Sequence, residues 1–181
     1  MSRLASRRPT SAESSSEYHH LLIEQVEGDC VLTILDSQLH WLCELAGHVS
    51  TEQVDKIHPP YGWTIRQVVE HCADAERVFG YRMLRFAAGD QTALSGWQEN
   101  EYADSRFGLG NFGQLIEELA SLRRSNVILL RRIVPKAWDR CGEADGQQVT
   151  VRALAWIAAG HLQHHLEIIE KRCGVAPRRS P

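Results

Sequence analysis

Hydrophobic residues recur at spacings of three and four over four stretches of the chain, a period that predicts four amphipathic α-helices. Asp29 and Gly47 are the expected caps of the first. Thr64 and Gln67 have the spacing of a capping box at the start of the second, and Thr150 is a good N-cap for the last. The predicted helices cover about residues 29–47, 64–89, 111–134 and 150–172, and a short helical piece over 18–26 precedes the first.

The connections between the predicted helices differ greatly in length. Pro59 and Pro60 predict a loop over residues 50–62, and a polar stretch over 139–148 predicts a small hairpin. Residues 90–110 form a connection longer than most loops in compact domains, which is typical of a functional segment. A connection of this length allows the second and third helices to run parallel as well as antiparallel. The pattern as a whole predicts an all-α fold, a four-helix bundle.

Composition narrows the class of protein. The chain has 181 residues, enough for one domain, and a net charge of −3 at pH 7. This charge argues against a general nucleic-acid-binding protein, which needs a basic surface. No apolar run approaches the roughly 20 residues of a membrane-spanning helix, and the basic N-terminus lacks the apolar segment of a secretory signal. The five cysteines are odd in number and form no C-x-x-C pair, which favours a reduced, cytoplasmic protein.

The chain is predicted to form one domain between two tails. Residues 1–17, rich in serine and arginine, are expected to be a disordered N-terminal tail. The helical domain is expected over residues 18–174, and residues 175–181 are expected to form a C-terminal tail.

Two histidines on the apolar face of the last helix are the strongest chemical signal. His161 and His165 are four residues apart, so their imidazoles stand one turn apart on the same face. Both occupy a stripe that otherwise packs into the core, where unpaired polar rings are costly. A shared metal ion would satisfy both rings, whereas a single core histidine is usually just hydrogen-bonded. Leu162 stands where a zinc protease of the H-E-x-x-H type has its glutamate, so that class is excluded.

A third ligand would come from another helix, because catalytic zinc sites often use three protein ligands and leave one position open. His71, at the edge of the apolar stripe of the second helix, is the candidate. Asp74 follows three residues later on the same face. It could bind an imidazole that holds the ion, bind the ion itself or act as a base, or it could be an ordinary solvated residue.

Three segments of the chain resemble, in order and spacing, the signature of the DinB-like superfamily, also called YfiT-like. They are Trp63-Thr-Ile-Arg-Gln-Val-Val-Glu-His-Cys-Ala-Asp-Ala-Glu-Arg77, Tyr81-Arg-x-Leu-Arg-x-Ala-x-Gly-Asp90 and Gly160-His-Leu-Gln-His-His-Leu166. The resemblance covers about residues 20–173. It implies a four-helix bundle with a long crossover connection after the second helix. It also implies one divalent metal ion, zinc or nickel, bound by His71, His161 and His165.

The resemblance also implies what such a protein does. Members are often homodimers, and the better-understood ones transfer low-molecular-weight thiols, while others are regarded as metal-dependent hydrolases. We therefore expect a metal-dependent enzyme, a thiol S-transferase or a hydrolase, that acts on a small-molecule substrate at an open three-histidine site. A metal-binding or stress-response protein without turnover is the alternative, as is a structural module whose histidines only form hydrogen bonds.

Within the enzyme hypothesis, charged residues of the second helix have candidate roles. Asp74 or Glu76 would orient a ligand histidine. Arg82 and Arg85 would bind a carboxylate of the thiol cofactor, or else would form ion pairs with nearby acids on the helix surface.

Residues near the long connection complete the candidate site. Trp63, Trp97 and Tyr102 are expected to line the pocket, although a tryptophan such as Trp63 is more often a core residue. Glu99 and Glu101 follow a Gly-aromatic pair at the place where relatives carry acids. The sequence alone does not decide which of the two occupies the acidic position.

Overall fold

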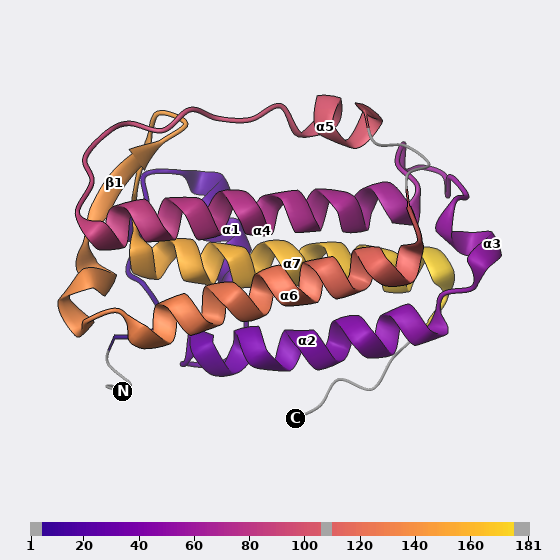
Figure 1. The fold of residues 1–181 in the computed structure, drawn as a ribbon, viewed down its shortest axis with the longest axis horizontal. Helices are drawn as coiled ribbons and strands as arrows, with labels where there is room; N and C mark the ends of the chain where they lie inside the picture. The colour runs from indigo at the N-terminus through magenta and orange to yellow at the C-terminus, as the bar shows by residue number, and fades with distance from the viewer. Residues whose placement is uncertain (1–4, 106–109, 176–181) are drawn as a thin grey trace.

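The computed structural model describes residues 5–105 and 110–175, and four long helices pack side by side in it as a bundle (Figure 1). These helices are α2 (Val31–His48), α4 (Ile65–Ala88), α6 (Phe112–Arg132) and α7 (Val151–Cys173). The predicted all-α, four-helix-bundle fold is therefore confirmed. The shorter elements are the 3₁₀ turns η1 (Ser11–Glu13) and η2 (Pro135–Asp139), the helices α1 (Glu17–Glu24), α3 (Thr51–Val54) and α5 (Glu99–Ser105), and the strands β1 (Cys141–Ala144) and β2 (Gln147–Thr150).

The ends of the long helices follow from local side-chain chemistry. The Thr64 hydroxyl accepts a hydrogen bond from the backbone N–H of Gln67, whose side chain completes the predicted capping box of α4. Asn111 and Thr150 cap α6 and α7 through their own side chains. Gly89 ends α4 in the left-handed region, with a φ of 88°.

Some local predictions differ from the structure. α2 begins after Cys30 instead of Asp29, and Gly47 lies inside it because the helix continues to the next residue. The loop predicted over 50–62 includes the one-turn helix α3, and the connection over 90–110 includes α5. Both helices are too short to show a hydrophobic period, so the pattern along the chain does not reveal them.

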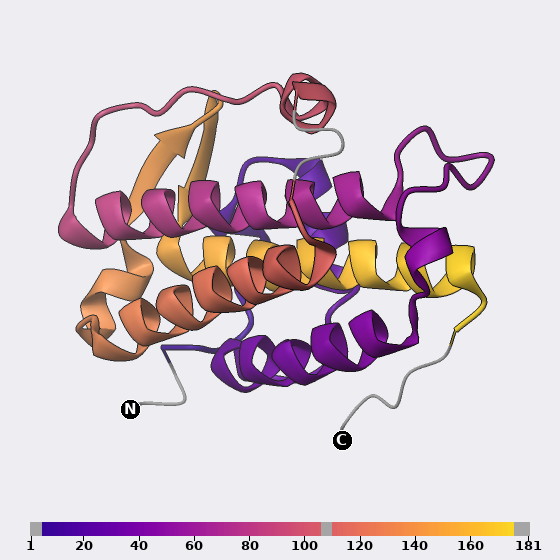
Figure 2. The same ribbon diagram turned by 45° about the vertical axis from the view of Figure 1, so that its right-hand side comes forward.

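The connection from α4 to α6 runs back along the bundle. Figure 1 shows it leaving the end of α4, passing along that helix and reaching α5 before α6 begins. α4 and α6 consequently run in the same direction, and α2 and α7 run in the opposite one (Figures 1 and 2). The connection and α5 thereby lie over α4, the helix that carries His71.

The polar stretch over 139–148 forms the predicted hairpin, in which β1 and β2 pair antiparallel. The register pairs Cys141 with Thr150, Gly142 with Val149, Glu143 with Gln148 and Ala144 with Gln147. Asp145 and Gly146 form the tip with positive φ values of 55° and 70°. An isolated parallel bridge between Leu94 and Ala144 fixes the long connection to this hairpin.

The segment before α1 packs against the bundle, although it was predicted to be a disordered tail. The buried guanidinium of Arg152 donates to the carbonyl of Ala5 (2.9 Å) and to the carboxylate of Glu13 (2.6 Å). The indole N–H of Trp156 donates to the carbonyl of Arg7 (2.8 Å). The segment is ordered because it supplies acceptors to two buried donors of α7, which would be costly to leave unpaired.

Residues 5–16 thus belong to the folded domain. Residues 1–4 of the predicted N-terminal tail and residues 176–181 of the predicted C-terminal tail lie outside the described residues. In the part of the chain that the structure describes, no helix combines the length and the apolar character needed to cross a bilayer.

A buried ion pair links the helices of the core. Arg123 on α6 is fully buried, and its guanidinium lies 2.6 Å from the carboxylate of Glu76 on α4. It also donates to the side chain of Gln38 (2.8 Å) and to the carbonyl of Ala158 (3.0 Å), while Asn126 donates to Glu76 (2.9 Å). Both charges are therefore paired and hydrogen-bonded, as charges in a core must be.

Candidate metal centre

α4 and α7 bring three histidine side chains to one point. His71, His161 and His165 each offer a ring nitrogen, and these three nitrogens all lie within 4.8 Å of one another. The centroids of the three rings are 4.6 to 4.8 Å apart. Nε2 of His71 lies 2.9 Å from Nε2 of His161. The structure thus gathers the residues that the sequence pointed to as metal ligands.

The positions of the three rings follow from helix geometry. His161 and His165 stand one turn apart on the face of α7 that meets α4, and His71 lies in the second turn of α4. Gly160 allows α1 to pack closely on the same part of α7, because a Cβ at this position would collide with the carbonyl oxygen of Leu22. This close approach brings α1 beside the histidines.

Burial keeps the three imidazoles neutral. His71 and His161 are 3% and 7% exposed, and His165 is partly buried. The loss of hydration lowers the pKa of His71 and lowers the pKa values of His161 and His165 well below their ordinary range. Positive charge on a neighbouring imidazole would lower the latter two further, whereas the carboxylates of Glu99 and Asp74 raise the pKa of His71. Neutral imidazole is the form that binds a metal ion.

This donor set fits a divalent transition-metal ion. Imidazole nitrogen is a common ligand of zinc, nickel, copper and iron. Nδ1 of His71 is buried and has no hydrogen-bond partner among the described residues, so hydrogen bonding does not fully satisfy this ring. Three ligands of this kind would leave a position of the ion open to a substrate or a water molecule.

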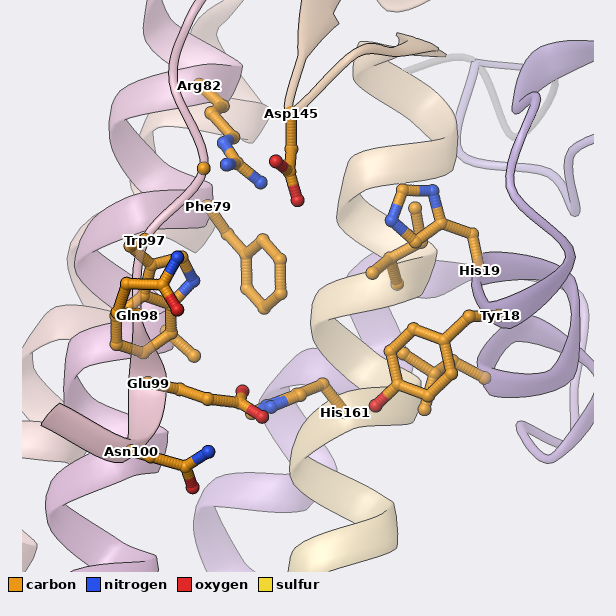
Figure 3. A pocket seen from close by; sticks show the side chains of 14 residues that line it. Tyr18, His19, Phe79, Arg82, Trp97, Gln98, Glu99, Asn100, Asp145 and His161 are labelled. Carbon is orange, nitrogen blue, oxygen red and sulfur yellow. The ribbon is translucent and has the colours of Figure 1, made fainter. Parts of the chain in front are cut away.

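A cavity of about 440 Å³ lies beside His161 (Figure 3). Residues of α1, α4, α7, the long connection and the hairpin tip form its wall. Glu99 of α5 points into it, and its carboxylate lies 3.9 Å from Nε2 of His71. The ring of Trp97 stacks on His71, with 5.5 Å between centroids and 6° between planes. The candidate metal centre therefore lies at the wall of a cavity large enough for a small molecule.

Comparison with known proteins shows the family of the chain. The family model of the DinB superfamily matches residues 34–169, which is most of the chain. The chain belongs to the DinB superfamily. Its sequence is similar to that of a protein of Oceanobacillus iheyensis named "Putative metal-dependent hydrolase", with 25% identity over 130 residues. The matched region is 69% of this chain and 73% of that protein.

Among solved structures, this DinB protein is similar to YfiT from Bacillus subtilis, described as "a probable metal-dependent hydrolase with an unusual four-helix bundle topology". The match has a TM-score of 0.72 and covers 95% of this chain and 99% of that one, at 19% sequence identity. This likeness shows a shared fold.

In this DinB protein, no hydrogen bond joins Asp74 to Nδ1 of His71. Asp74 is buried and lies 3.5 Å from Arg77 on its own helix, while Nδ1 of His71 has no partner among the described residues. Asp74 affects His71 through its charge, which raises the pKa of the imidazole. Glu76, the other predicted orienting residue, pairs with Arg123 instead.

The two arginines predicted to bind a cofactor occupy different environments. Arg82 lines the cavity and donates to the carbonyl of Ser95 (3.3 Å). Arg85 lies outside the cavity, where its guanidinium donates to the carboxylate of Asp90 and to the hydroxyl of Tyr81. Arg85 thus forms the helix-surface ion pair that was the alternative to a binding role.

Two aromatic side chains pack close to His71. The rings of Trp63 and Trp97 lie 5.2 and 5.5 Å from it, between centroids. Tyr102 packs edge-on against Trp97, at 5.4 Å, and is not among the residues that line the cavity. Of the predicted pocket residues, Trp97 therefore lines the cavity, whereas Trp63 packs against the hydrophobic core beside His71 and Tyr102 packs against Trp97.

The cavity also contains residues that sequence reasoning missed. Tyr18, His19 and Asp145 line it, yet they come from α1 and the hairpin tip, which carry no motif. Of the two candidate acids in α5, Glu99 points into the cavity, whereas Glu101 is exposed and does not line it. Tyr18, His19 and Asp145 reach the cavity only because α1 and the hairpin pack against α4 and α7.

Proposed function

We propose that this DinB-superfamily protein is a metal-dependent hydrolase of a small-molecule substrate, with a zinc or nickel ion held by His71, His161 and His165. The observation that carries the proposal is the convergence of three imidazoles, one of which, His161, lines a cavity that also holds the carboxylate of Glu99. The names of the two similar proteins from Oceanobacillus iheyensis and Bacillus subtilis support the same chemical class.

The bound ion would supply Lewis acidity, lowering the pKa of a coordinated water or thiol toward neutrality. The carboxylate of Glu99 lies 3.9 Å from Nε2 of His71, so it would accept the proton of the attacking nucleophile. Tyr18 points into the cavity beside His161 and Glu99 (Figure 3). Burial and the nearby charge of Glu99 raise the pKa of Tyr18, so the phenol stays protonated and would donate to a developing oxyanion.

Aromatic rings pack against two of the three candidate ligand histidines. Trp97 stacks on one face of His71, and Phe79 packs edge-on against His161 at 5.6 Å between centroids. These contacts restrict rotation of the two imidazoles. Groups that are held in place need less reorganisation when an ion or a substrate binds.

Thiol transfer is the second candidate, because it depends less on a strong base at the metal centre than hydrolysis does. Leu162 is buried next to the ligand His161, so α7 provides no carboxylate there, and the side chain of Glu99 is 55% exposed. A thiol needs less help from a base than water does, because its pKa is far lower. A low-molecular-weight thiol would then be the second cofactor. The homodimeric state and the cytoplasmic location stay predictions.

Turnover assays on metal-loaded protein separate these candidates. Esters and amides would be supplied alone, and epoxides and activated halides would be supplied with and without small thiols. Hydrolysis that falls about a hundredfold in Glu99→Gln, and is unchanged in the matched control Glu101→Gln, is the expected result. Turnover only in the presence of a thiol would favour the transferase. Stoichiometric metal without any turnover would contradict both and favour a metal-binding protein.

A further inference from the structure

The end of the cavity opposite the metal centre carries one positive and one negative side chain. Figure 3 shows Arg82 and Asp145 facing each other there, while His161 and Glu99 lie at the other end. Arg82 is on α4, about three turns beyond His71, and Asp145 is at the hairpin tip. The two charges interact through space, but no ion pair joins them within the part of the chain that the structure describes.

Three consecutive residues of the long connection position both charges. The carbonyl of Leu94 accepts a hydrogen bond from the backbone N–H of Asp145 (2.9 Å). The carbonyl of Ser95 accepts one from Nη2 of Arg82 (3.3 Å). The carboxylate of Asp145 lies against Gly96, where any Cβ would collide with it. The same short segment therefore fixes the positions of both side chains relative to each other.

Both groups keep unused binding capacity. Nη2 of Arg82 is bonded to Ser95, and no described residue accepts a hydrogen bond from its other guanidinium nitrogens, which together suit a carboxylate. The carboxylate of Asp145 is at an exposed position and accepts no hydrogen bond from the described residues. It is therefore available to a cation.

His19 adds no charge at this end. Its Nδ1 is bonded to the hydroxyl of Ser14 (2.8 Å). Burial, with the nearby positive charge of Arg82, lowers the pKa of His19 to about 4, so the ring is neutral at neutral pH. The end of the cavity thus presents one cation and one anion to a ligand.

We infer that this end of the cavity binds the carboxylate and ammonium groups of an α-amino acid, which makes the substrate an amino-acid derivative with its reacting group at the metal centre. The carboxylate would bind Arg82 and the ammonium group would bind Asp145. The rest of the substrate would pass Phe79, which lies between the two ends in Figure 3. The reacting end rests on the proposed function, whereas the head-group site rests on Arg82 and Asp145 alone.

The pair of opposite charges also discriminates between ligands. A dianion such as a phosphate ester would bring negative charge next to Asp145, and a diamine would bring positive charge next to Arg82. A ligand with one charge would leave one protein group desolvated and unpaired, which is unfavourable. A zwitterion satisfies both groups at once.

Binding of matched hydroxamates to the zinc-loaded protein tests the inference. Glutamate γ-hydroxamate combines a metal-binding group with an amino-acid head. Glutaric monohydroxamate lacks the amine, and 4-aminobutyrohydroxamate lacks the carboxylate. Their dissociation constants would be measured by calorimetry, with longer homologues of all three to match the length of the cavity. We expect loss of either head group to weaken binding to the wild type about tenfold at the best-fitting length.

Variants assign each head group to its residue. In Asp145→Asn, the hydroxamates with and without the amine should bind with equal affinity. Asparagine tolerates the positive φ of this position, so the turn should be preserved. In Arg82→Gln, the hydroxamates with and without the carboxylate should bind with equal affinity. The matched control Arg85→Gln should show the same preferences as the wild type.

Equal affinities of the three hydroxamates in the wild type, abolished together in His161→Ala, would overturn the head-group site and leave the metal centre intact. Failure of every hydroxamate, including acetohydroxamate, to bind would overturn both proposals. A head-group preference that persists unchanged in Asp145→Asn and Arg82→Gln would overturn the assignment of the site.

Discussion

Nε2 of His71 and Nε2 of His161 lie 2.9 Å apart, although 90 residues separate them in the chain. One ring belongs to α4 and the other to α7, so the distance between them depends on the packing of these two helices. An ion bound by both rings would therefore bind the folded chain in preference to the unfolded one. Metal binding and the stability of the bundle should be linked.

Removal of the metal should accordingly lower the melting temperature. A ligand present at about one hundred times its dissociation constant stabilises the folded state by about 2.7 kcal/mol. For a chain of this length, that corresponds to a shift of roughly 5–10 °C. Thermal unfolding followed by circular dichroism, with and without a chelator, would measure the shift. An identical melting temperature after chelation of metal-loaded protein would contradict the linkage.

Loss of the buried arginine should destabilise the bundle strongly. Arg123→Met leaves the buried carboxylate of Glu76 without its ion pair, which typically costs about 3–5 kcal/mol. Arg131→Met is the matched control on the same helix, because Arg131 pairs with Asp36 at the surface and such pairs contribute at most about 1 kcal/mol. Urea unfolding of the two variants should separate them clearly. Equal stabilities would show that the buried pair contributes no more than a surface pair.

A methyl group at Gly160 should disturb the packing of α1 on α7. Gly160→Ala places a Cβ against the backbone carbonyl of Leu22, and such overpacking costs about 1–3 kcal/mol. Gly47→Ala is the control, because no atom lies within 4 Å of the added carbon and alanine favours the helix by up to about 1 kcal/mol. Opposite signs of the two changes in unfolding free energy are expected. A stabilising Gly160→Ala would show that α1 is not closely packed there.

Stability should fall at acidic pH through His19. Burial is the largest cause of its lowered pKa of about 4, Arg82 and His20 lower it further, and Asp145 opposes them. An unfolded histidine has a pKa of about 6.5, so the unfolded chain takes up a proton over this interval and the folded chain does not. The unfolding free energy is unaffected above about pH 6.5 and decreases as the pH falls toward 4.

The variant His19→Gln removes this titration and can still bond Ser14. Relative to that variant, the unfolding free energy of the wild type should decrease by roughly 1 kcal/mol between pH 7 and pH 4.5. The decrease is small because solvent screens a partly exposed group. Urea unfolding at the two pH values measures the difference. A difference between the two proteins that does not change with pH would contradict the lowered pKa.

The sequence predicts the bundle well because its helices carry long apolar stripes with clear caps. The Thr64–Gln67 capping box and the Thr150 N-cap begin α4 and α7 where expected. The i, i+4 spacing of His161 and His165 also places two ligands on one face without further information. Family resemblance supports His71 as the third ligand. Periodicity within α4 does not by itself predict that α4 packs against α7.

The remainder of the site depends on segments that have no period. Glu99 and Glu101 have equal standing in the sequence, and only the orientation of α5 separates them. Asp145 sits in a polar turn, and its meeting with Arg82 depends on the bridge between the long connection and β1. Such contacts arise from tertiary packing, so the composition of a single segment does not predict them.

Elemental analysis of protein purified without a metal-affinity tag tests the central claim most directly. The wild type should contain about one equivalent of zinc or nickel, the ratio of a single three-histidine centre. His161→Ala should lose it, while His164→Ala, which alters a neighbour outside the ligand cluster, should retain it. Absence of metal from the wild type after reconstitution, or full retention by His161→Ala, would contradict the metal centre and the function proposed from it.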